Sequence, residues 1–274
     1  MPFLTIPFPA IDPIIVQIGP LAIRWYALAY VAGLVLAWWL MRRMAARAPV
    51  GPAGTVSAEA VDDFLVWATI GVVLGGRLGY VLFYQFQFYA HNPLSIFQVW
   101  RGGMSFHGGL LGVVVATILF CWKRGIPLMV FSDMIATVAP IGLFLGRLAN
   151  FVNGELFGRP TDVPWAMVFP HGGPFPRHPS QLYEAALEGL LLFALLQLIW
   201  RVEPLRRRRG LTAGLFFLGY AAARAFAELF RQPDVQIGFL AGGSTMGQWL
   251  SLPMVLFGVF LVGRAVLAKQ QQNG

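Results

Sequence analysis

The sequence has few charged residues and a single cysteine. Of its 274 residues, 12% are Asp, Glu, Lys or Arg, and 57% are hydrophobic. A soluble domain of this size carries about twice that charged fraction, so the deficit predicts a surface that faces lipid. The lone cysteine, Cys121, lies in an apolar run, which excludes internal disulfides and cysteine metal clusters. Any thiol chemistry therefore needs a cysteine from a partner.

The first residues also lack positive charge. Residues 1–19 contain no lysine or arginine, and their four prolines are Pro2, Pro7, Pro9 and Pro13. A cleavable signal peptide needs a basic start and an uninterrupted apolar core, so this composition does not predict one. We expect residues 1–20 to form an interfacial arm ahead of the first membrane span.

Seven segments are long and apolar enough to cross about 30 Å of hydrocarbon. They are residues 21–41, 64–83, 104–122, 128–149, 181–200, 211–230 and 245–267. Asp133 and Pro140 predict that the fourth is kinked or partly irregular. We therefore predict an all-α polytopic membrane protein with one membrane domain. Spans one to four lie in residues 21–150, and spans five to seven lie in residues 181–274.

Lysine and arginine gather on one side of these spans. Twelve follow spans one, three, five and seven: Arg42, Arg43, Arg47, Lys123, Arg124, Arg201, Arg206, Arg207, Arg208, Arg209, Arg264 and Lys269. Cytoplasmic loops are enriched in these residues, so we expect the N-terminus outside and the C-terminus in the cytoplasm. The long connection 151–180 then forms a small extracytoplasmic head. Because the positive charge lies beside spans rather than on one basic face, no nucleic-acid partner is expected.

Three arginines fall within predicted spans: Arg77, Arg147 and Arg224. An arginine at mid-bilayer costs at least about 2.5–3.5 kcal/mol, so it usually faces a polar interior. Tyr220, Arg224, Glu228 and Arg231 follow the spacing of a single helix face. Pairing of Arg224 with Glu228 would leave Arg231 as surplus positive charge near the outer end.

Polar residues also mark the outer ends of three other spans. Span four ends with Arg147, Asn150, Asn153 and Glu155; span three begins beside His107; span one begins with Arg24, Trp25 and Tyr26. Polar groups from four spans thus converge at one depth. This convergence predicts a functional site near the outer surface.

Some of these residues also have a purely structural interpretation. Arg24 and Trp25 are typical of an interfacial anchor. Arg77 could be paired structurally, and its flanking Gly75 and Gly79 have the spacing that lets helices pack closely. His107, taken alone, is more typical of a structural histidine than of a catalytic one.

The polar site suits phospholipid chemistry. A planar guanidinium makes bidentate, charge-assisted hydrogen bonds to phosphate, and a histidine can take up a proton near neutral pH. The sequence has no Ser-His-Asp arrangement and no His-Glu-x-x-His motif, and we expect no metal and no cofactor. A secondary transporter and a non-catalytic scaffold are the alternatives. The absence of repeat symmetry, and polar groups crowded at one side rather than the midplane, disfavour a transporter.

The same residues resemble the signature of the bacterial prolipoprotein diacylglyceryl transferase family. The matching runs are residues 24–26, 106–109, 146–159, 178–184, 224–234 and 246–249. They cover nearly the whole chain in family order. Ala149 stands where the family pattern has glycine.

The resemblance implies seven spans and an extracytoplasmic head in the bacterial inner membrane. It implies transfer of the sn-1,2-diacylglyceryl group of phosphatidylglycerol to the lipobox cysteine of a prolipoprotein, which gives a thioether and glycerol phosphate. His107, Arg147 and Arg224 are then the candidate catalytic residues, with His107 as base. The candidate substrate-binding residues are Tyr26, Arg147, Asn150, Asn153, Glu155, Gly158, Tyr220, Glu228 and Arg231. Neighbouring arginine alone can make a thiol reactive. The alternative role of His107 is therefore to position the lipid.

Overall fold

The computed structural model describes residues 6–9, 11–19, 21–47, 56–233 and 238–270. Parts of four predictions lie outside these ranges: residues 1–5, 10 and 20 of the arm, 48–55 of the stretch 21–150, 234–237 and 271–274 of the stretch 181–274, and Asp234 of the run 224–234. The chain divides into two compact units. The first unit comprises Met1–Trp39 and Asp133–Gly274, and the second comprises Leu40–Ser132.

Within the described ranges, six helices are long and apolar enough to cross a membrane. They are α1 (Trp25–Arg47), α2 (Ala58–Phe83), α4 (Phe106–Arg124), α5 (Leu128–Val152), the continuous run Ser180–Arg201, and α10 (Met246–Gln270). The sixth predicted span, 211–230, corresponds to α9 (Leu211–Ala227), a shorter apolar helix of 17 residues. A mostly helical chain with these six helices agrees with a polytopic membrane protein.

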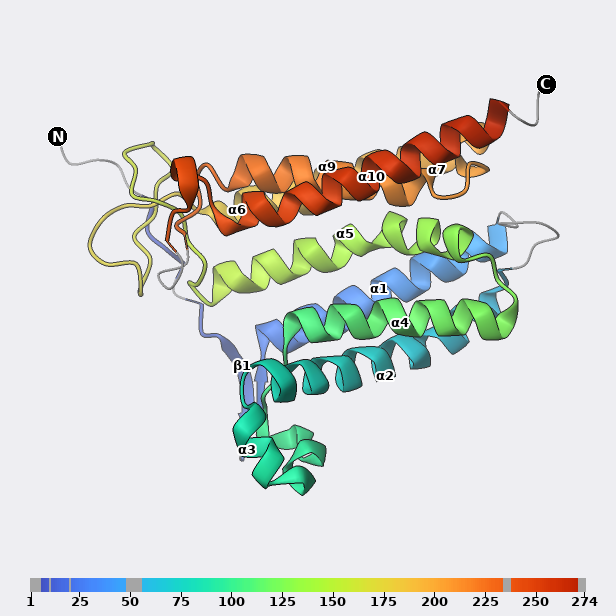
Figure 1. Cartoon of the computed structure of the whole chain (residues 1–274). Coiled ribbons are helices and arrows are strands. Elements are labelled where there is room, and N and C mark those ends of the chain that lie inside the picture. Colours follow the sequence, from blue (N-terminus) through green and yellow to red (C-terminus); the bar gives the residue numbers. More distant parts are fainter. Residues whose placement is uncertain (1–5, 10, 20, 48–55, 234–237, 271–274) are drawn as a thin grey trace. The chain divides into compact units, whose positions relative to one another are not determined.

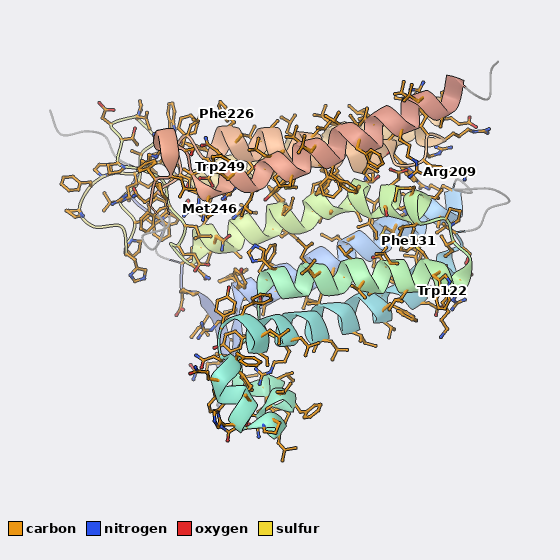
Figure 2. All side chains as sticks on the ribbon, in the orientation of Figure 1. Trp122, Phe131, Arg209, Phe226, Met246 and Trp249 are labelled. Atoms are coloured by element: carbon orange, nitrogen blue, oxygen red, sulfur yellow. The ribbon has the colours of Figure 1, made fainter. Side chains whose placement is uncertain are left out.

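Large apolar side chains cover the outside of the helices. Trp122, Phe226 and Trp249, which are labelled in Figure 2, are exposed, and Trp122 is 82% exposed. Exposed apolar area on this scale is rare in soluble monomers. The exposed side chains therefore match the surface facing lipid that the low charge content predicts.

The N-terminal arm contains strands. β1 (Ile14–Ile18) and β2 (Leu21–Arg24) form an antiparallel pair, and Gly19 has a positive φ of 58° at the turn. The prediction that the first helix begins at residue 21 is therefore wrong, because it begins at Trp25. Ile, Val and Leu in this stretch favour pleated backbone as readily as membrane helix. The chain is thus mostly helical rather than purely so.

In the second unit, α2 and α4 lie side by side (Figure 1) and meet through glycines. A Cβ placed on Gly79 would lie 2.7 Å from Gly108 Cα, and one on Gly75 would lie 2.7 Å from Gly112 Cα. The structural interpretation of this glycine spacing is confirmed. Cys121 is buried in the same helix pair.

Arg77 fastens a short helical insertion to the second unit. The insertion comprises α3 (Phe86–His91), η2 (Pro93–Phe97) and η3 (Val99–Arg101). The Arg77 side chain donates to the carbonyl oxygens of Ser95, Ile96, Gln98, Gly102 and Gly103, at 2.5–3.2 Å. Only 3% of Arg77 is exposed, so the structural interpretation of this arginine is confirmed.

In the first unit, α5 is an unbroken helix through Pro140. The predicted irregular stretch is therefore absent from α5, and whether the helix is kinked there stays a prediction. An irregular stretch occurs in the next span, where α6 (Ser180–Glu184) and α7 (Leu192–Arg201) flank a π-helical segment, η4 (Ala185–Leu191). Asp133 has a structural task. Its Oδ2 accepts the N–H of Gly210 at 2.6 Å and its Oδ1 that of Ala213 at 2.8 Å, which caps the start of α9.

The remaining elements connect and cover this unit. α8 (Glu203–Arg206) joins α7 to α9, and η5 (Ala241–Gly243) precedes α10, which lies beside α9 (Figure 1). The head loop, residues 151–180, folds around Phe169, which contacts Phe8, Phe151 and Phe157. The head loop therefore packs on the described part of the N-terminal arm.

Candidate active site

Charged side chains from three helical segments meet inside the first unit. Arg147 comes from α5; Glu184 and Glu188 come from α6 and η4; Arg224, Glu228 and Arg231 come from α9 and the turn that follows it. We call these six residues the guanidinium cluster. All six belong to segments separated by up to 84 positions, so tertiary packing rather than local sequence assembles it.

Glu184 is the centre of the cluster. Arg147 Nε lies 2.9 Å from Glu184 Oε2, and Arg224 Nη1 lies 2.8 Å from Oε1. Arg231 Nη1 lies 3.1 Å from the same Oε1. Three guanidinium groups therefore share one carboxylate that has no exposed surface.

Glu188 lies one turn further along the π-helical segment. Its Oε2 is 3.2 Å from Arg147 Nη2, and its Oε1 is 3.7 Å from Arg224 Nη1. The π-helical segment begins directly after Glu184 and contains Glu188. Such segments occur frequently at functional sites, and here one follows Glu184 directly and carries Glu188 to the same arginines.

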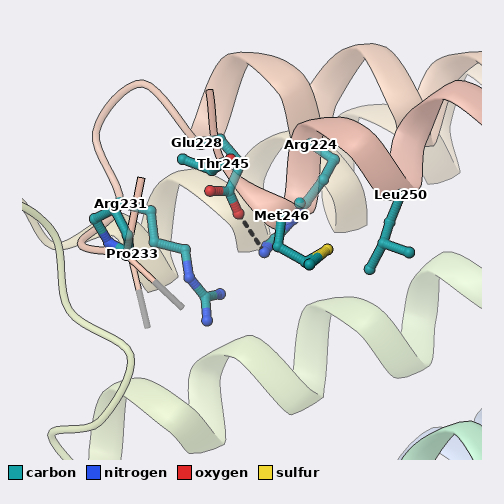
Figure 3. Close-up of a pocket in the computed structure, with 9 residues that line it drawn as sticks. Arg224, Glu228, Arg231, Pro233, Thr245, Met246 and Leu250 are labelled. Carbon is teal, nitrogen blue, oxygen red and sulfur yellow. Dashed lines mark ion pairs between the residues drawn. The ribbon is translucent and has the colours of Figure 1, made fainter. Parts of the chain in front are cut away.

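Arg224 also pairs with Glu228, as the helical spacing predicted (Figure 3). Arg159 of the head loop holds the backbone beyond them, because it donates to the carbonyl oxygens of Glu228 and Arg231 at 3.0 and 2.9 Å. The prediction that Arg231 carries surplus charge is wrong, since Glu184 is its partner. The sequence spacing on one helix could not reveal a partner from another.

The accessible part of the cluster is cationic. Three arginines face three glutamates, so the cluster has no formal net charge. Glu184 and Glu188 have 0% side-chain exposure, whereas Arg147 and Arg224 keep 16% and 14%. Two fully buried carboxylates thus hold two guanidinium groups that remain partly exposed.

Two predicted tyrosines lie near this cluster. The Tyr220 hydroxyl lies within electrostatic range of Glu188, Arg224 and Arg147. The Tyr26 hydroxyl lies 3.4 Å from that of Tyr30, which feels the charge of Arg147. Tyr220 and Tyr30 therefore lie within electrostatic range of the cluster, and Tyr26 is adjacent to Tyr30.

Asn150, in the last turn of α5, is joined to Asn153 and Glu155 of the turn that follows the helix. Glu155 Oε1 accepts from Asn150 Nδ2 at 2.8 Å and from Asn153 Nδ2 at 3.3 Å. Gln181 Nε2 donates to the Glu155 carbonyl oxygen at 2.7 Å, which ties the turn to the start of α6. Glu155 remains exposed, so this turn presents an oriented carboxylate.

Gly158 contributes backbone rather than a functional group. Its N–H donates to His178 O at 2.9 Å, and Arg177 Nη1 donates to its carbonyl oxygen at 3.2 Å. A Cβ on Gly158 would lie 2.6 Å from both His178 O and Phe230 O. The glycine is therefore needed where the head loop meets the end of α9.

Gly158→Ala is expected to lower the thermal stability of the protein in detergent and to reduce its activity. The added methyl group pushes the two carbonyl groups apart and shifts the backbone that carries Arg231; overpacking of this kind costs about 1–3 kcal/mol. A thermal unfolding curve measures the effect. Gly173→Ala is the comparison. A Cβ on Gly173 meets open space, so a loss of stability there comes from its positive φ of 78° and not from overpacking. An unchanged melting temperature for Gly158→Ala would contradict the proposed contact.

His107 follows Ser105, which caps the start of α4 in the second unit. Its ring lies 5.7 Å from that of Phe106. It is not part of the guanidinium cluster described in the first unit, and its role as base stays a prediction. Among the described residues, no group of His, Cys, Asp and Glu could hold a metal ion.

His178 lies in the head loop beside Arg159. Burial, together with the positive charge of Arg159, lowers the pKa of His178. The ring is therefore neutral at pH 7 and its Nδ1 lies 3.1 Å from the Tyr183 hydroxyl. Trp165 Nε1 donates to that same hydroxyl at 2.6 Å. These contacts make His178 a structural residue of the head loop.

Glu184 and Glu188 are the cluster residues that the sequence interpretation did not select. Their signal was present, because two glutamates four positions apart stand in an otherwise apolar span. Acidic groups there are as costly as arginines and need partners. Considering the acidic residues within the predicted spans together with the basic ones would have indicated Glu184 and Glu188 as partners of the arginines.

A family model described as prolipoprotein diacylglyceryl transferase matches residues 13–264. The chain belongs to this family. A phosphatidylglycerol–prolipoprotein diacylglyceryl transferase of Rhodospirillum rubrum is 62% identical over 264 residues, with 94% of each chain covered. The protein of that name from Azospirillum brasilense is 59% identical, with 96% of this chain and 97% of the relative covered. The resemblance inferred from the motifs is confirmed.

Proposed function

We propose that this protein transfers the diacylglyceryl group of phosphatidylglycerol to the cysteine thiol of a prolipoprotein lipobox. The sulfur forms a bond to the glyceryl carbon as the bond between that carbon and the phosphate oxygen breaks. The thiol loses its proton, and glycerol phosphate leaves. The names of the close relatives support this reaction, and the single cysteine of the chain, which is buried, leaves the nucleophile to the substrate.

The mechanism rests on the arrangement of charge in the guanidinium cluster, in which partly exposed arginines lie against buried glutamates. Arg147 and Arg224 remain partly exposed above two fully buried carboxylates. Each guanidinium has five N–H donors, so the ion pairs to Glu184 and Glu188 use only part of the set. The remaining donors stabilise the phosphate as it takes up the electrons of the breaking bond.

We propose His107 as the base that takes the thiol proton. His107→Gln is then expected to lower the transfer rate by about 10²-fold or more, the usual contribution of a positioned base. Loss of an ionisable side chain also changes the pH profile. Rates of the purified parent and variant across roughly pH 5.5–8.5 measure both effects. A rate and pH profile equal to those of the parent would exclude the base role.

We further propose seven spans, with α9 as the sixth, in the inner membrane of the bacterial cell. The twelve positive residues beside spans one, three, five and seven support a cytoplasmic C-terminus and an N-terminus outside. The head loop and the guanidinium cluster then belong to the extracytoplasmic side. The remaining candidate residues at this site are Tyr26, Asn150, Asn153, Glu155, Gly158, Tyr220, Glu228 and Arg231.

Incubation of the purified protein with phosphatidylglycerol labelled in its headgroup and a lipobox peptide tests the proposal. We expect release of labelled glycerol phosphate and a peptide whose mass increases by one diacylglyceryl group. A peptide in which serine replaces the cysteine is the control. If the parent protein releases no glycerol phosphate with the cysteine peptide, the proposed reaction is wrong and a transporter or scaffold becomes the better interpretation.

A further inference from the structure

A small cavity lies beside the guanidinium cluster, between the end of α9 and the start of α10 (Figure 3). Arg224, Glu228 and Arg231 form its polar wall. The described residues of its other wall are Pro233, Gly238, Thr245, Met246, Gly247 and Leu250. All of these residues belong to the first unit. Arg147 is not among the lining residues, so the cavity extends the cluster on the Arg224 side.

The size of the cavity limits what it can hold. It measures about 110 Å³, and a single water needs about 10–15 Å³ of such space. A polar group of several heavy atoms therefore fits, whereas the two acyl chains of a diacylglyceryl group do not. The cavity is correspondingly too small for a folded peptide segment.

The polar wall offers both donors and an acceptor. Arg224 and Arg231 supply N–H donors, and Glu228 supplies a carboxylate that is 3% exposed. The ion pair of Glu228 joins its Oε1 to Arg224, and a carboxylate has about four acceptor positions in all. Glu228 can therefore accept from hydroxyl groups while its pairing with Arg224 persists.

Gly247 keeps this carboxylate at the cavity wall. A Cβ on Gly247 would lie 2.7 Å from Glu228 Cδ and 3.1 Å from Arg224 Nε. The backbone of α10 thus passes directly against the ion pair, and any larger residue would displace it. This contact accounts for the glycine of the run 246–249, which the catalytic mechanism does not use.

We propose that this cavity is the site of the leaving group, in which Glu228 accepts hydrogen bonds from the glycerol hydroxyls of the phosphatidylglycerol headgroup. The inference rests on the proposed transfer reaction and adds the origin of its headgroup preference. Arg224 and Arg231 hold the phosphate at the mouth, and the glycerol occupies the cavity beside Glu228. A headgroup of similar size without hydroxyls leaves the buried carboxylate without these donors. The enzyme is therefore expected to discriminate strongly against lipids with such a headgroup.

The test compares phosphatidylglycerol with phosphatidylpropanol of the same acyl chains, each in mixed micelles with a lipobox peptide. The parent is expected to prefer phosphatidylglycerol in kcat/KM by about 10-fold or more, as hydrogen bonds to a charged group predict. Glu228→Gln is expected to reduce that ratio, because an amide is a weaker acceptor. If Glu228→Gln acted only by disturbing Arg224, transfer from both lipids would slow equally and the ratio would stay unchanged.

Glu203→Gln is the matched control, since Glu203 pairs with Arg207 at the same i, i+4 spacing on an exposed surface. Its ratio should equal that of the parent. A second measurement covers the case in which Glu228→Gln is inactive. Glycerol phosphate should inhibit the parent more strongly than propyl phosphate does.

Three results overturn the inference while leaving the transfer reaction intact. The first is a parent that uses both lipids equally well. The second is equal inhibition by glycerol phosphate and propyl phosphate. The third is an unchanged lipid ratio in an active Glu228→Gln variant, which removes Glu228 from headgroup recognition. A parent inactive with every lipid contradicts the proposed function instead.

Discussion

Replacing Arg147 or Arg224 with glutamine is expected to lower kcat/KM for diacylglyceryl transfer by about 10²–10³-fold, the loss seen when one donor to a developing anion is removed. Both side chains are partly exposed above buried carboxylates, and both lie within 3 Å of Glu184. Removal of either takes away one of the two guanidinium groups whose side chains are 16% and 14% exposed. Release of glycerol phosphate at several lipid concentrations measures the effect.

Loss of stability must be separated from loss of chemistry in these variants. Arg147→Gln leaves Glu188 buried with less compensation, which destabilises the cluster. Adding Glu188→Gln restores the charge balance, so the double variant should recover much of the melting temperature without recovering activity. If the double variant regains the parental rate, Arg147 serves only to neutralise Glu188, and its role at the phosphate is wrong.

Glu184→Gln is expected to produce the largest loss of stability, about 3–5 kcal/mol, because breaking a buried ion pair leaves uncompensated charge. Here three arginines lose the same fully buried partner. The variant should unfold at a much lower temperature than the parent and accumulate poorly in membranes. Thermal unfolding in detergent provides the measurement.

Glu188→Gln is the graded comparison for this effect. Glu188 is equally buried but contacts two arginines, at 3.2 and 3.7 Å, instead of three. Its melting temperature should fall by less than that of Glu184→Gln. The reverse order of the two melting temperatures would show that Glu184 is not the centre of the cluster.

The helices were the most predictable part of the fold, because the length of an apolar run is fixed by the thickness of the bilayer. The predicted fifth span, 181–200, differs by one residue at each end from Ser180–Arg201. The start of the first helix was missed because Leu21–Arg24 is apolar enough for a span yet pairs as a strand with β1. Hydropathy does not distinguish these two outcomes.

Within the site, the sequence predicted the contacts that lie on one helix and missed those between helices. The pair of Arg224 with Glu228 follows from their spacing of four. The contact of Arg231 with Glu184 joins residues 47 positions apart, and no local pattern encodes it. Asp133, which seemed to weaken the fourth span, instead accepts backbone N–H groups at the start of α9.

The length of α9 has a consequence for the lipid around it. At 1.5 Å per residue, a helix of 17 residues is about 26 Å long, shorter than the roughly 30 Å of a typical hydrocarbon layer. A bilayer relieves such hydrophobic mismatch by thinning locally, and flanking charged side chains reach toward the water. With α9 as a span, the membrane is therefore expected to dip beside its outer end. A substrate lipid arriving there would already hold its phosphate at the depth of Arg224.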